Sequence, residues 1–151
     1  MKLNYSKLKY LIVAFILISL TQSSFAQSIV GRWKTIDDNS GKTRSIVEIY
    51  KKDDKYFGKI VKLYREPGEP QDPLCEECKG DKKNQKVLGM EIITNLEYDP
   101  EEEEYTDGEI LDPENGNIYD CKICMDEHGE LKVRGYLYFL YRTQTWLPAE
   151  S

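Results

Sequence analysis

The sequence predicts an all-β fold, a single antiparallel up-and-down barrel of about eight strands. Short runs rich in Val, Ile, Tyr, Thr and Trp are separated by turn residues about every 8 to 12 positions, a spacing typical of β-sandwiches and barrels. Most connections between these runs are short, so consecutive strands are expected to form hairpins. Closing such a meander into a barrel removes its exposed edges, which favours a barrel over an open sheet.

The individual strands are recognised by alternation of apolar and polar side chains. Val47 and Ile49 alternate with Glu48 and Tyr50, as expected of a strand with one buried face. The apolar run 87–96 shows no clear period and is compatible with either a strand or a short helix. Strands are predicted at residues 29–35, 45–51, 56–64, 105–111, 118–125, 131–138 and 141–147.

The stretch 65–84 interrupts this regular pattern. It contains three prolines and two glycines among many charged residues, and it shows no periodicity. Irregular segments of this length are uncommon in compact domains and are often functional. We therefore expect this segment to contribute to whatever the barrel binds or contacts.

The N-terminus has the zoned character of a cleavable signal peptide at residues 1–26. Three lysines with no acid precede an apolar run at 11–20, and Ser24 and Ala26 are the small residues that a signal peptidase accepts. The apolar run is shorter than the roughly 20 residues that span a bilayer, so no stable membrane anchor is expected. The sequence thus predicts a periplasmic or secreted protein with one domain at 27–151.

The charge balance limits the classes of partner. The chain has 21 basic and 27 acidic residues, a formal net charge of −6, and loss of the lysines in the signal peptide makes the balance more negative. Nucleic acids and anionic membrane surfaces attract basic proteins, so neither is expected as a partner. The composition does not identify a protein partner.

The four cysteines form two Cys-x-x-Cys pairs with different expected fates. In an exported chain cysteines are more often oxidised than metal-bound. Cys121 and Cys124 lie in a predicted strand, where their side chains point to opposite faces, so they should neither bond together nor share a zinc ion. Cys75 and Cys78 lie in the irregular segment and are expected to bond to each other. A bond from either of these two to Cys121 remains open.

No catalytic residue, metal or cofactor is predicted. His128 is the only histidine and falls in a turn before Gly129, where solvent exposure is expected. Asp112 and Glu114 lie in a second turn, where such residues cap the backbone, and EF-hand spacing is absent. The sequence contains neither a Gly-x-Ser-x-Gly elbow nor a glycine-rich phosphate loop, so an enzyme is not expected.

One short motif resembles the signature of the lipocalin-like barrels. It consists of Gly31-Arg32-Trp33 in the first predicted strand and Arg142 in the last. In that superfamily the tryptophan closes one end of the barrel and a basic residue lies across its ring, a cation–π contact. The resemblance implies this role for Trp33 and Arg142.

Longer motifs lie in order along the chain: GRWKT at 31–35, GKI at 58–60, CEECKG at 75–80, GEILDP at 108–113, LKVRGY at 131–136 and RTQTW at 142–146. Together they resemble a bacterial family known as domain of unknown function 2147. The resemblance implies an exported β-barrel and no assigned reaction. Cys124 departs from the family pattern, in which a bulky or apolar residue is usual.

The polar faces of the predicted strands suggest a binding cavity. We expect Tyr119, Arg134, Tyr136 and Gln144 to line it and to bind a small apolar or amphipathic ligand. Small barrels hold one small ligand or are filled by their own side chains, and the sequence leaves both possibilities open. The alternative function is therefore a structural or protein-interaction module of the cell envelope, with a filled barrel and a partner bound by the segment 65–84.

Overall fold

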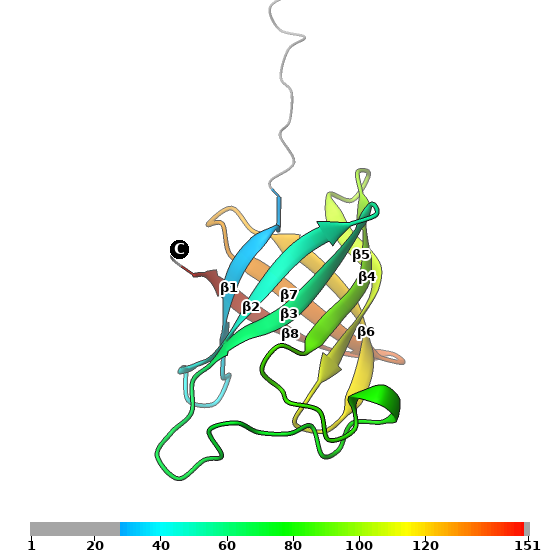
Figure 1. Cartoon of the computed structure of the whole chain (residues 1–151). Coiled ribbons are helices and arrows are strands. Elements are labelled where there is room, and N and C mark those ends of the chain that lie inside the picture. The colour runs from blue at the N-terminus through cyan, green and yellow to red at the C-terminus, as the bar shows by residue number, and fades with distance from the viewer. Residues whose placement is uncertain (1–27, 150–151) are drawn as a thin grey trace, which may run out of the picture.

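The computed structural model describes residues 28–149, which form a closed barrel of eight antiparallel strands (Figure 1). Each strand pairs with the next along the chain, and β8 pairs with β1, so the predicted up-and-down barrel is confirmed. The expected signal peptide and its cleavage site lie outside the described residues. The strands are β1 Gly31–Ile36, β2 Thr43–Lys52, β3 Lys55–Leu63, β4 Glu91–Asp99, β5 Glu104–Asp112, β6 Asn117–Met125, β7 Leu131–Leu137 and β8 Leu140–Pro148.

The ambiguous run 87–96 forms a strand over its second part, in β4. Ile93 and Leu96 are both fully buried although they lie three residues apart, a spacing that a regular strand does not allow. A bulge explains it: three residues of β4 oppose two of β3, and Asn95 takes a φ of 61°. This extra residue turns the strand and brings both side chains inside.

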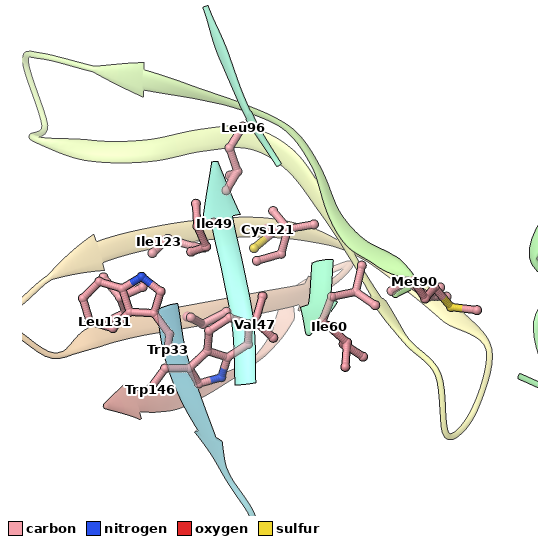
Figure 2. Close-up of a cluster of buried hydrophobic side chains, with 14 of the residues drawn as sticks. Trp33, Val47, Ile49, Ile60, Met90, Leu96, Cys121, Ile123, Leu131 and Trp146 are labelled. Carbon is pink, nitrogen blue, oxygen red and sulfur yellow. The ribbon is translucent and has the colours of Figure 1, made fainter. Parts of the chain in front are cut away.

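One end of the barrel is closed by packed apolar and aromatic side chains. Ile29, just before β1, is fully buried, and its carbonyl accepts a hydrogen bond from Nε1 of Trp33 at 2.8 Å. The ring of Tyr105 packs edge-on against Tyr56, with centroids 4.7 Å apart, and lies 5.0 Å from the ring of Tyr98. We call this the closed end. Figure 2 shows part of the buried cluster that continues from it into the barrel.

The opposite end, which we call the open end, is crossed by the long β3–β4 connection (Figure 1, green). This segment has its own structure: Leu74 forms a β-bridge with Lys86, and a short 3₁₀ helix, η1, spans Gly80–Lys82. The amide of Cys75 donates to the carbonyl of Gln85, and the amide of Asn84 donates to that of Cys75. The segment predicted to be irregular is therefore a folded cover over one rim of the barrel.

The predicted disulfide between Cys75 and Cys78 is confirmed. Both residues are buried, and the segment that carries them packs on the β5–β6 turn. At Gly116 in that turn a methyl group would collide with the carbonyl of Glu77 and lie 2.7 Å from the amide nitrogen of Cys78. The alternative bond to Cys121 is wrong, because Cys121 is a free thiol inside the barrel.

Candidate ligand-binding cavity

The barrel contains a cavity of about 990 Å³ that reaches the surface at the open end. Its volume lies at the upper limit of the roughly 300–1,000 Å³ typical of small-molecule sites. Its rim comes from the β1–β2, β3–β4 and β5–β6 connections and the β7–β8 hairpin, all of which meet at this end. Its apolar wall is contributed by inward-facing residues of six strands, among them Ile60, Ile92, Ile110, Val133 and Trp146.

A few polar groups interrupt this apolar wall. The hydroxyls of Thr35 and Ser45 are 2.7 Å apart and form one hydrogen bond, and Ser45 is 7% exposed. Oε1 of Gln144 lies 3.4 Å from Nε1 of Trp146. The hydroxyl of Tyr119 accepts a hydrogen bond from Nδ2 of Asn115 at 3.2 Å. Tyr119 and Gln144, both expected at the cavity, do line it; their role in binding stays a prediction.

The expectation that Arg134 and Tyr136 line the cavity is wrong. Nε of Arg134 donates to the hydroxyl of Thr143 at 3.0 Å, and its guanidinium lies 5.0 Å from the ring centre of Tyr141. Arg134, Tyr136 and Thr143 do not line the cavity and occupy the outer face of β7 and β8. The inner face of β7 carries Val133 and Gly135, because the barrel interior takes the apolar face of this strand and water takes its polar face.

The expected contact between Trp33 and Arg142 is also wrong. Nε of Arg142 donates to a carboxylate oxygen of Asp38 at 2.9 Å, and Arg142 lies on the rim of the cavity. Trp33 is buried at the closed end, opposite Pro148. Arg142 and Pro148 are six residues apart on β8, a separation of about 20 Å along a strand. Trp33, which lies opposite Pro148, and Arg142 are therefore at opposite ends of the barrel.

Charged side chains surround the cavity mouth, and Arg44, Asp72, Glu114 and Arg142 among them form ion pairs. Arg44 forms ion pairs with Glu69 at 3.2 Å and with Glu114 at 2.9 Å, which raise the pKa of its guanidinium. A carboxylate oxygen of Asp112 caps the amide of Glu114, as expected for this turn. Arg65 also lines the cavity, but it belongs to none of the ion pairs found in residues 28–149.

The sequence reasoning missed Arg44 and Arg65 at the cavity. Both lie at the ends of predicted strands, Arg44 just before one and Arg65 just after another. The alternation did not mark Arg65, because the register of β2 and β3 shifts between Ile60 and Leu63, and a strict period of two from Ile60 points to Tyr64 instead. No local pattern marked Arg44, since its partners Glu69 and Glu114 come from connections distant in sequence.

The two free cysteines lie on different faces of β6, as predicted. Cys121 is 2% exposed inside the barrel, and burial raises the pKa of its thiol to about 12. Cys124 is half-buried on the outer face, and burial raises its thiol pKa as well. Both thiols are therefore protonated at neutral pH, the form that is a poor nucleophile and a poor metal ligand.

Residues 28–149 contain no group of three or more His, Cys, Asp or Glu side chains placed to hold a metal ion. Within the same part of the chain, no helix is long and apolar enough to cross a membrane.

A closed eight-stranded up-and-down barrel with a cavity open at one end defines a lipocalin-like barrel. The fold is similar to that of protein HP1028 from the human pathogen Helicobacter pylori, which is described as belonging to the lipocalin family. The two chains are 16% identical, the match covers 82% of this chain and 84% of the other, and the TM-score is 0.68. At this identity the similarity concerns the fold alone.

The chain belongs to the DUF2147 family, described as an uncharacterized protein conserved in bacteria, which matches residues 31–147. The predicted family membership is therefore confirmed. No curated protein sequence matches the chain.

Proposed function

We propose that this protein binds one small amphipathic molecule inside its barrel. The observation that carries the proposal is the cavity itself, about 990 Å³ in a barrel of this size. Its wall is mainly apolar and its rim is polar and charged, which suits a ligand with an apolar body and a polar end. The alternative of a filled barrel is less well supported, because the inner side chains leave this volume free.

The proposed role is binding rather than catalysis. The chain's only histidine, His128, lies in the β6–β7 turn at the closed end, away from the cavity. The carboxylates of Asp37 and Asp112 at the rim accept hydrogen bonds from backbone amides of their own turns. Both carboxylates therefore cap the backbone of their turns.

We also propose that the protein works in the periplasm or outside the cell. The signal-peptide pattern of residues 1–26 and the disulfide between Cys75 and Cys78 support this location, because such bonds form in oxidising compartments. N-terminal sequencing of protein secreted by the native host should begin at Gln27. Recovery of full-length protein from the cytoplasm would contradict the proposal.

Binding is tested by titration with the neutral fluorescent probe N-phenyl-1-naphthylamine. Gly135 faces the cavity, and a Cβ there would lie 3.5 Å from Cβ of Tyr119, an ordinary contact, so a larger side chain extends into free space. We expect saturable binding of one probe to the wild type, and Gly135→Phe to weaken it at least about tenfold.

The matched control is Arg134→Phe on the same strand, whose side chain lies outside and should leave probe affinity unchanged. Gly135→Val tests the same point with a smaller side chain if Gly135→Phe folds poorly. Absence of saturable binding to the wild type, or equal binding by the Gly135 and Arg134 variants, would contradict the proposal. Native mass spectrometry of the purified protein would show any ligand that it carries.

A further inference from the structure

Arg65 is the feature of the cavity that the fold alone does not explain. It lies two residues after Leu63, and both side chains line the cavity. Tyr64 between them points away, with its ring 4.7 Å below Nζ of Lys62, while its amide donates to the carbonyl of Arg44. The strand alternation thus continues beyond β3 and directs an arginine to the cavity.

In the part of the chain that the structure describes, Arg65 lacks the ion-pair partners that the other arginines of the rim have. Its Nε is fully buried and has no hydrogen-bond acceptor in the described chain, the one such side-chain atom found there. Arg44 is paired with Glu69 and Glu114, and Arg142 with Asp38. A buried donor without an acceptor costs free energy, and few such groups occur in native structures.

The acids near Arg65 are already engaged. Glu69 accepts hydrogen bonds from Arg44 and from the backbone amide of Glu66, and Glu66 pairs with Lys42 at 2.8 Å. Asp72 is bound to Lys86 at 2.6 Å. These three acids are therefore engaged by other groups, and within the described residues the guanidinium of Arg65 has no ion-pair partner.

We infer that the ligand of this barrel carries an oxyanion head group, such as a carboxylate, which binds Arg65 at the mouth while its apolar part enters the barrel. The inference rests on the proposed function and adds the chemical class of the ligand. A guanidinium presents its N–H groups in a planar fork that matches two oxygens of a carboxylate. The apolar wall formed by Ile60, Val133 and Trp146 accepts the rest of the molecule.

The exposed acidic side chains at the cavity mouth suggest an alternative to an oxyanion head group. Glu76 and Glu77 also line the cavity and have no ion-pair partner among the described residues. They would favour a cationic head group. Both side chains are exposed to water, which weakens their field, whereas the Nε of Arg65 is buried.

The experiment compares three probes that share a ten-carbon chain: decanoate, decanol and decylammonium. Each displaces N-phenyl-1-naphthylamine from the wild-type protein at pH 7.5 and low salt. We expect decanoate to bind about ten- to a hundredfold more tightly than decanol, the range for a charge-assisted hydrogen bond, and decylammonium to bind most weakly. Added salt should reduce the affinity for decanoate and not that for decanol.

Three variants locate the effect. Arg65→Gln should remove the preference for decanoate and leave decanol binding unchanged, and Arg65→Lys should retain part of the preference because the charge remains. Arg134→Gln, a matched arginine on the outer face, should behave as the wild type. Circular dichroism and the urea midpoint confirm that each variant is folded.

The outcomes separate this inference from the proposed function. Equal binding of decanoate and decanol, tightest binding of decylammonium, or an undiminished preference in Arg65→Gln would overturn the oxyanion head group while leaving a binding barrel. Binding of none of the three probes, with no displacement of N-phenyl-1-naphthylamine, would refute both.

Discussion

The closed and open ends of the barrel are built by different kinds of interaction. At the closed end Trp33 is 6% exposed and donates to the carbonyl of Ile29, and Tyr105 packs against two further tyrosine rings. At the open end the groups that meet are charged and partly exposed, as in the pair of Arg142 with Asp38. Burial of large apolar side chains contributes far more free energy than exposed ion pairs do.

This difference indicates that the two ends of the barrel have different roles. The closed end supplies packing, whereas the open end has free volume and charged groups. The free energy of unfolding should therefore respond strongly to changes at the closed end and weakly to changes at the rim, while probe binding should respond in the opposite sense.

The largest effect is expected from Trp33→Ala at the closed end. Removing a buried indole should lower the free energy of unfolding by about 3–5 kcal/mol. Urea denaturation measures the loss. Leu137→Ala, at a rim position that is 50% exposed, is the control and should cost less than about 1 kcal/mol. A loss below about 1 kcal/mol for Trp33→Ala would show that the closed end does not stabilise the fold more than the rim does.

Gly116→Ala should have the second largest effect, because it strains the contact between the β5–β6 turn and the disulfide segment. Gly116 has a φ of 69°, and its Cβ would collide with the carbonyl of Glu77. We expect a loss of about 2–3 kcal/mol together with weaker probe binding, since the segment must move.

Its matched control is Gly41→Ala. Gly41 has nearly the same φ, 68°, but nothing lies within 4 Å of an added Cβ. Only the backbone conformation is then penalised, about 1 kcal/mol, and probe binding should not change. Equal losses for the two variants would show that the segment does not rest on the β5–β6 turn.

Reduction of the disulfide should cost somewhat less than Gly116→Ala. Cys75 and Cys78 are three residues apart, so the closed ring is small and the chain-entropy treatment gives about 2 kcal/mol. Urea unfolding with and without dithiothreitol measures this value, and alkylation of the free thiols confirms the reduction. A loss above about 4 kcal/mol would mean that the segment belongs to the structural core.

The smallest effect is expected for the ion pair between Arg142 and Asp38. Their side chains are 65% and 41% exposed, so solvent screens the attraction. A double-mutant cycle with Arg142→Gln and Asp38→Asn should give a coupling energy below about 1 kcal/mol that decreases further in salt. A coupling above about 2 kcal/mol would show that the open end is also held by its charges.

Much of the fold was predictable because strand alternation is a local property. Val47 and Ile49 face inward as the pattern indicated, and the eight strands follow one another in sequence order. Cys75 and Cys78 were expected to bond for a similar reason, since an irregular backbone lets two nearby sulfurs meet. The bulge in β4 was not predictable, because an extra residue destroys the period by which a strand is recognised.

By itself the sequence determined the barrel and most of its strands, and it favoured the pairing of Cys75 with Cys78, because alternation, turn residues and short sequence separations act locally. The tertiary structure decided which face of β7 turns inward, and this places Arg134 outside. The stagger of β1 against β8 separates Trp33 from Arg142. Closure of the sheet brings connections distant in sequence to one rim, and this assembly of distant segments leaves Arg65 at a cavity with no partner among residues 28–149.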